Sequence, residues 1–301
     1  MPRLFCVPKL YRIAAFSCTL LATLGTVRAD PPTTSEPALP KQAVIISFDS
    51  ARDIGQWERS RALAKRTGAH FTYFLSCVYL LSKDTARQYK APHKAAGKSN
   101  IGFAPSKQDV AARLEQIRLA ASEGHDIGSH ACGHFDGKGW SKADWLAEFG
   151  EVRRILENAY ALNGISPEPD DWRAFAEKAI VGFRAPYLST GKALYQALPE
   201  AGFVYDASGV SRGPALPATI DGITRFALPL VPEGPKGKPV IAMDYNLYAR
   251  HSGAKEQPAD AKMFEDRAYA AFRAAFDAQY AGKRIPLEIG FHFTLMNGGA
   301  Y

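Results

Sequence analysis

The chain has 301 residues, of which 47% are hydrophobic and 22% are charged, and its formal net charge is +7. This is ordinary globular composition, with enough apolar residues for a barrel-sized domain. Residues 1–29 carry four basic side chains and no acidic one, so subtracting these four from +7 leaves +3 for residues 30–301. So small an excess, without a nucleic-acid-binding motif, argues against nucleic acid as a partner.

Residues 1–29 have the pattern of a secretory signal peptide. Arg3, Lys9 and Arg12 precede an apolar run over residues 13–24, which is short for a bilayer span. Cleavage is predicted before Asp30, and an uncleaved anchor is the alternative. Residues 30–40 contain four prolines and are predicted to be a flexible linker before a domain at 41–301. We therefore expect a secreted or periplasmic protein with no stable membrane span after cleavage.

The domain alternates apolar runs with segments of helical periodicity. This alternation predicts parallel βαβ units, which are typical of an α/β barrel. A long stretch over residues 82–106, of weak periodicity, is predicted to be an insertion over one end of the fold. The predicted strands are 43–47, 69–76, 125–129, 180–183, 203–205, 240–243 and 287–291, and the predicted helices are 57–66, 108–123, 141–159, 194–198 and 259–280.

Polar or charged residues follow six of these apolar runs. In parallel α/β barrels the carboxyl ends of the strands carry the active site. We therefore expect these residues to converge at one mouth of the barrel: Asp49, His130, Arg184, Asp206, Asp244 and His292.

His130 and His134 are the first candidates for metal binding. Two imidazoles four residues apart can reach one ion if the segment between them turns once, although two solvated loop residues would share this spacing. Cys132 lies between them, and Cys77 follows an earlier predicted strand. In an oxidising compartment these two cysteines are expected to form a disulfide. The alternatives are that Cys132 is a soft metal ligand or that both thiols are free.

Four fragments, in order from about residue 43 to residue 292, resemble the motifs of one family. They are Ser47-Phe48-Asp49-Ser50, His130 with His134, Arg184-Ala185-Pro186-Tyr187 and Gly290-Phe291-His292. The pattern resembles the polysaccharide deacetylases (NodB-homology proteins, carbohydrate esterase family 4). Residues 203–206 and 243–246 are similar to the chitin-deacetylase-like branch. The resemblance implies a distorted (β/α) barrel and a hydrolase that removes acetyl groups from amino-sugar polysaccharides.

The resemblance also implies a role for each motif residue. His130 and His134 would hold a divalent metal, usually zinc, and Asp49 would be the base that activates water. Arg184 would orient Asp49, the backbone N–H of Tyr187 would help to stabilise the oxyanion, and His292 would protonate the leaving amine. These roles match the chemistry of amide hydrolysis, which needs an activated water, a base, an oxyanion donor and an acid.

Ser50 departs from the family pattern, because it stands where the family has its third metal ligand, an aspartate. Three outcomes are open. Asp49 becomes the third ligand and leaves the base role to another carboxylate, Asp53 supplies the ligand, or the site binds metal weakly and catalysis is slow or absent.

Two further departures concern the later part of the chain. The family's Asp-x-x-Asp-Trp motif is missing, so Asp206 or Asp244 is expected to orient His292. The sequence ends at Tyr301, soon after the last predicted strand. Without the family's final helix an apolar face of that strand would be uncovered, so either the chain is truncated or its closing element differs from the family's.

The expected substrate is a polysaccharide such as peptidoglycan or a chitin-like glycan. Several aromatic residues near the motifs could stack on sugar rings: Phe135, Trp140, Trp172, Tyr187, Tyr245 and Tyr248. Because of Ser50, a catalytically impaired carbohydrate-binding relative is the alternative to a deacetylase. A C–N hydrolase acting on a small amide is a third reading.

Overall fold

The computed structural model describes residues 39–301. The predicted signal peptide at 1–29, and all but the end of the predicted linker, lie outside this range. Within it, none of the helices combines the length and the apolar character that crossing a bilayer requires.

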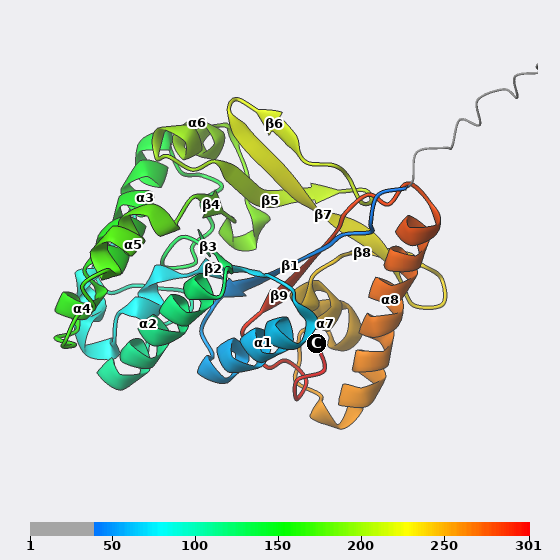
Figure 1. The fold of residues 1–301 in the computed structure, drawn as a ribbon, viewed down its shortest axis with the longest axis horizontal. Helices are drawn as coiled ribbons and strands as arrows, with labels where there is room; N and C mark the ends of the chain where they lie inside the picture. The colour runs from blue at the N-terminus through cyan, green and yellow to red at the C-terminus, as the bar shows by residue number, and fades with distance from the viewer. Residues whose placement is uncertain (1–38) are drawn as a thin grey trace, which may run out of the picture. The chain divides into compact units, whose positions relative to one another are not determined.

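Seven strands form a parallel sheet that curls towards a barrel (Figure 1). The order along the sheet is β6-β7-β5-β4-β3-β2-β1-β9, in which β6 alone is antiparallel to its neighbour. The apolar runs expected of buried strands account for most of these elements. The parallel strands are β1 (Val44–Ser50), β2 (Thr72–Leu75), β3 (Asp126–Ser129), β4 (Gly182–Phe183), β5 (Tyr205–Ser211), β7 (Ile223–Glu233) and β9 (Leu287–His292).

Two antiparallel strands distinguish this sheet from the predicted alternation. β6 (Ala218–Ile220) and β8 (Lys238–Ile241) both pair with β7, and β7 itself was not predicted. The backbone after β8 then joins the two ends of the parallel sheet, because Ala242 N–H donates to Pro229 O and Gly290 N–H donates to Ala242 O, each at 2.9 Å. This bridge from β7 to β9 confirms the distorted barrel.

Helices pack on the outside of the sheet, most of them where helical periodicity was predicted. Ser141 and Asp144 form the reciprocal capping box at the start of α3. The helices are α1 (Ile54–Thr67), α2 (Lys107–Ser122), α3 (Lys142–Glu157), α4 (Ala159–Leu162), α5 (Trp172–Ala179), α6 (Lys192–Glu200), α7 (Asp244–Ser252) and α8 (Ala261–Ala281). Short 3₁₀ turns are η1 (Cys77–Leu80), η2 (Lys83–Gln88), η3 (Pro186–Leu188) and η4 (Pro258–Asp260).

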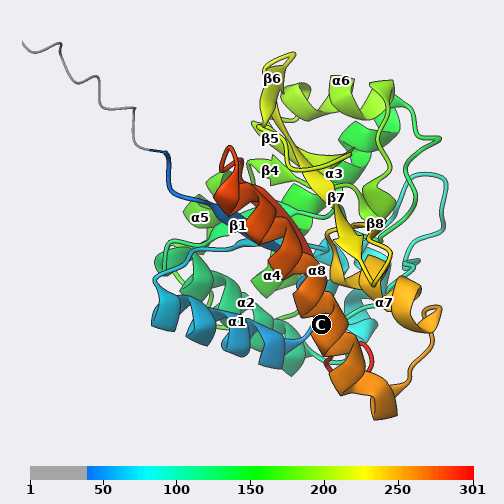
Figure 2. The same ribbon diagram turned by 90° about the vertical axis from the view of Figure 1, so that its right-hand side faces the viewer.

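The outer face of β9 is covered. α8 lies along this side of the barrel (Figure 2), and Leu287 and Ile289 of β9 are buried in one cluster with its alanines. Phe272 and Phe276 of α8 pack against the same cluster, as expected of a core-facing stripe. The helix that precedes β9 in the sequence therefore provides the cover that a following helix was expected to provide.

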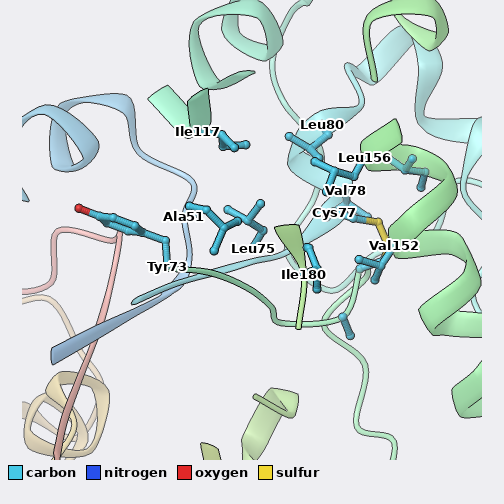
Figure 3. Packing of buried hydrophobic residues seen from close by; sticks show 14 of the residues in the cluster. Ala51, Tyr73, Leu75, Cys77, Val78, Leu80, Ile117, Val152, Leu156 and Ile180 are labelled. Carbon is cyan, nitrogen blue, oxygen red and sulfur yellow. A yellow bond between two sulfur atoms is a disulfide. The ribbon is translucent and has the colours of Figure 1, made fainter. Parts of the chain in front are cut away.

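A second, larger apolar cluster contains the predicted disulfide. Cys77 and Cys132 are bonded to each other, and both are fully buried among side chains of η1 and α3 (Figure 3). The alternatives for Cys132, a metal ligand or a free thiol, are therefore wrong.

The interior of the barrel contains a buried carboxyl group that no motif predicted. Glu288 lies on the face of β9 opposite to Leu287 and Ile289, and only 5% of its surface is exposed. Burial raises the pKa of Glu288 to about 7, although the charge of Arg184 and a backbone hydrogen bond from Ala227 lower it. The ionised form of Glu288 is therefore a destabilising element above neutral pH.

We predict that Glu288→Gln stabilises the protein at high pH. The pKa of Glu288 is raised in the folded state, so the folded protein binds this proton more tightly than the unfolded chain does. The resulting contribution to the free energy of unfolding is complete below the ordinary pKa of 4.5 and is lost as pH rises through about 7. The gain should be on the order of 2 kcal/mol at pH 8.5 and close to zero at pH 4.5. Urea unfolding at the two pH values measures it, with exposed Glu58→Gln as the control. An equal effect of Glu288→Gln at both pH values would contradict this account.

Candidate active site

Four of the predicted site residues meet at the carboxyl end of the parallel sheet. Asp49, the residue before the end of β1, lies beside His292 at the end of β9, and the two are in register. His130 follows β3 and Arg184 follows β4, which are also paired. Of the six residues predicted to converge, the strand ends thus bring these four to one edge of the sheet.

Asp49 and Arg184 form a buried ion pair. Nη1 of Arg184 donates to Oδ1 of Asp49 at 2.9 Å and to Oγ of Ser47 at 2.7 Å, and each side chain of the pair is 2% exposed. Burial alone would raise the pKa of Asp49, but the charge of Arg184, its hydrogen bond and the charge of His292 hold the pKa below its usual value. Asp49 is therefore an ionised carboxylate fixed in one orientation.

His130 presents a free ring nitrogen. Its Nδ1 lies 2.9 Å from the backbone oxygen of Arg184, which can only accept, so Nδ1 carries the proton. The lone pair is then on Nε2, which is buried without a hydrogen-bond partner. Burial lowers the pKa of His130 to about 3, so the ring is neutral at physiological pH.

His134 presents a second such nitrogen. Its Nδ1 is also buried without a partner, and the two imidazole rings lie 5.0 Å apart between centroids. Burial also lowers the pKa of His134, and the charge of His292 acts in the same direction. Two neutral, adjacent, unpartnered imidazole nitrogens fit a divalent cation, because buried polar atoms are otherwise paired.

A third protein ligand is missing from this pair. Among residues 39–301, no three His, Cys, Asp or Glu side chains form a group able to hold a metal ion. Asp49, predicted as a ligand, is bonded through its Oδ1 to Arg184. Asp53 is exposed and caps α1, because its Oδ1 accepts from Gln56 N–H at 2.9 Å, so the alternative that named it is wrong.

His292 has a carboxylate partner, and that partner is Asp244. Nδ1 of His292 lies 2.7 Å from Oδ1 of Asp244, and the backbone N–H of His292 donates to Oδ2 at 2.6 Å. Burial alone would lower the pKa of His292, but the charge and hydrogen bond of Asp244, and then the charge of Asp49, raise it above its usual value. Asp206 does not share this role, because its Oδ1 accepts from Ser208 at 2.5 Å.

Two exposed tyrosines flank these groups. The ring of Tyr187 lies 4.8 Å from that of His134, and the ring of Tyr245 lies 6.1 Å from that of His292. Tyr187 is 59% exposed and Tyr245 is 50% exposed. The other predicted aromatic candidates are core or partly buried; Trp172, for example, is fully buried and donates its indole N–H to Leu156 O.

The insertion at 82–106, predicted to lie over one end of the fold, reaches the same mouth. Nδ2 of Asn100 donates to the backbone oxygen of His134 at 3.0 Å and lies 3.4 Å from the hydroxyl of Tyr187. Asn100 is not among the residues predicted from the sequence, and for the partner of His292 the sequence offers both Asp206 and Asp244. For Asp244 its position after an apolar run was a usable signal, but Asn100 lies in a segment without periodicity and offered none.

Comparison with known proteins finds a likeness only among solved structures. No family model matches the sequence, and no curated protein matches it. A protein assigned as a polysaccharide deacetylase, from Mycobacterium smegmatis, is 18% identical with a TM-score of 0.44, over 85% of this chain and 79% of that one. The chitin deacetylase of Colletotrichum lindemuthianum is 18% identical with a TM-score of 0.34, over 55% of this chain and 54% of that one.

A carbohydrate esterase family 4 pseudoenzyme from Bacillus anthracis is also similar, with 10% identity and a TM-score of 0.43, over 87% of this chain and 59% of that one. The chain is similar to polysaccharide deacetylases. This is the family that the four motifs resemble.

We predict that Arg184→Met destabilises the fold by about 3–5 kcal/mol, because it leaves the buried carboxylate of Asp49 without its partner. The double variant Asp49→Asn/Arg184→Met should recover much of this loss, since neither group is then charged. Urea unfolding followed by circular dichroism measures both. Arg173→Met, which breaks a surface pair with Glu168, is the control and should change stability by less than about 1 kcal/mol. A double variant as unstable as Arg184→Met alone would contradict the prediction.

Proposed function

We propose that this protein is a metal-dependent hydrolase that removes acetyl groups from N-acetylated amino-sugar polysaccharides. The observation that carries the proposal is the pair of unpartnered nitrogens, Nε2 of His130 and Nδ1 of His134, close to an ionised Asp49. These two nitrogens would hold a divalent cation such as Zn²⁺. Such an ion polarises water and the acetamide carbonyl when it is bound.

The chain's own residues would move the protons. Asp49, held by Arg184, accepts a proton from the attacking water. As the water oxygen bonds to the acetamide carbon, the backbone N–H of Tyr187 donates to the oxygen that becomes negative. His292, held in its tautomer by Asp244, delivers a proton to the nitrogen as the C–N bond breaks. Acetate and a free amine are the products.

The surroundings of the site support a sugar polymer as the substrate. Tyr187 and Tyr245 expose about half of their surface or more on either side of the polar groups. Aromatic faces of this kind stack on the apolar faces of sugar rings. The proposed export of the protein fits peptidoglycan or a chitin-like glycan, both of which lie outside the cytoplasm.

A second candidate function is carbohydrate binding without hydrolysis. It is favoured by Ser50, a side chain without charge at the family's third ligand position, and by the lack of a three-ligand group in residues 39–301. The two candidates differ in whether the purified protein releases acetate or only binds the glycan.

We predict that the purified protein, incubated with Zn²⁺, releases acetate from acetylated chito-oligomers, and that His130→Ala reduces the rate at least 100-fold by removing one of the two cation ligands. Enzymatic quantification of acetate measures the rate. His93→Ala is the control, because His93 is an exposed histidine in the insertion that pairs with Asp144. Glycan binding without acetate release by the unmodified protein would favour the second candidate, and equal rates for His130→Ala and the unmodified protein would exclude the proposed site.

We predict that Asp244→Asn lowers kcat by about 100-fold and moves the alkaline limb of the pH–rate profile to lower pH. His292 acts as an acid, so activity falls as pH rises through its pKa. Asp244 raises that pKa, and its replacement therefore lowers the pH at which activity is lost. Profiles of kcat/KM from pH 5 to 10 measure the shift, with exposed Asp277→Asn as the control. An unmoved or raised alkaline limb would show that His292 is not the acid.

A further inference from the structure

The three residues between the two histidines form a buried, sharply bent segment. Ala131 is 2% exposed and Cys132 is fully buried. Ala131 and His134 both have left-handed backbone conformations, with φ of 55° and 54°. Such conformations are unfavourable for residues other than glycine and persist only when their surroundings hold them. The spacing of the two imidazoles therefore depends on what anchors this segment.

One side of the segment is anchored to η1. The disulfide joins Cys132 to Cys77, and the backbone N–H of Cys77 donates to Ala131 O at 3.1 Å. These contacts fix the first half of the segment. They leave the backbone N–H groups of Cys132 and Gly133 to be satisfied from elsewhere.

Glu148 of α3 satisfies both groups. Its Oε1 accepts from Cys132 N–H at 2.9 Å and from Gly133 N–H at 3.4 Å. Glu148 is fully buried, and none of the salt bridges of residues 39–301 includes it. A buried carboxylate without a cation is costly, and an apolar side chain would fill the same space without that cost. What Glu148 provides and an apolar side chain cannot is therefore the set of hydrogen bonds to the backbone of residues 132 and 133.

Tyr89, from the insertion at 82–106, completes the anchor. Its hydroxyl donates to Glu148, with distances of 2.9 and 3.0 Å to the two carboxylate oxygens, and accepts from Gly133 N–H at 3.0 Å. A Cβ atom at Gly133 would lie 2.7 Å from this hydroxyl, so the backbone approaches Tyr89 as closely as glycine allows. The insertion also holds Gly133 O, which accepts from Asn100 N–H at 2.9 Å.

We infer that Glu148, supported by Tyr89, is a positioning residue that holds the nitrogens of His130 and His134 at the spacing needed to bind one divalent cation. The inference rests on the proposed metal site and adds a residue outside its motifs. Both carboxylate oxygens of Glu148 accept hydrogen bonds. A glutamine keeps only one acceptor oxygen, so either the Tyr89 hydroxyl would have to turn from donor to acceptor or an N–H of the segment would face the NH₂ group. Either change alters the contacts that hold the segment.

The experiment measures cation affinity rather than activity. Chelator-treated protein is titrated with Zn²⁺ by calorimetry and with Co²⁺ by visible absorption, which reports the ligand geometry. Glu148→Gln should weaken the affinity for both ions by 10- to 100-fold and change the Co²⁺ spectrum. Tyr89→Phe, which removes one hydroxyl, should act in the same direction by a smaller factor. Glu151→Gln, on the same helix in a surface pair with Arg154, is the matched control and should bind as the unmodified protein does.

Each outcome decides the inference. A folded Glu148→Gln variant with unchanged affinity and spectrum would overturn it and leave the proposed function intact. If Glu148→Gln does not fold, Tyr89→Phe decides: weakened binding supports the inference, and unchanged binding overturns it. If the unmodified protein binds neither ion, the proposed metal site is overturned and this inference with it.

Discussion

The buried guanidinium of Arg184 connects the parts of the site to one another. Nη1 bonds to Asp49 and Ser47 of β1, Nε donates to Ala207 O of β5 at 2.9 Å, and the group stacks on the ring of Phe74 of β2. The backbone oxygen of the same residue sets the tautomer of His130. A buried guanidinium needs such partners, because an unpaired charge in the core is strongly destabilising. The carboxylate of Asp49 and the imidazole of His130 thus take their relative positions from one residue of the barrel.

The parts of this site that could be predicted from the sequence are those that depend on strand order alone. Asp49, His130, Arg184 and His292 each follow an apolar run, and in a parallel sheet the ends of such runs meet at one edge. The disulfide was likewise predictable, since an even pair of cysteines in a chain predicted to be exported is expected to be oxidised. Covalent and topological rules of this kind need no knowledge of distances.

The remaining features depend on contacts between segments far apart in the sequence. Glu148 and Tyr89 lie in a helix and in an insertion, where their types are ordinary, and only the folded chain places them against the histidine segment. β7 was missed because Pro229 and Pro232 interrupt its pattern, although both positions are tolerated in the sheet. A third ligand was predicted at Asp49 or Asp53; in the fold Oδ1 of Asp49 bonds to Arg184, and Asp53 caps the N-terminus of α1.

The central claim is that His130 and His134 bind one divalent cation without a third protein ligand from residues 39–301. Anomalous X-ray diffraction at the zinc edge, from crystals of protein dialysed after incubation with Zn²⁺, tests it most directly. The account predicts one strong peak in contact with Nε2 of His130 and Nδ1 of His134, with the remaining positions taken by water or buffer. A map without a peak between the two rings, or with the zinc bound elsewhere, would contradict it.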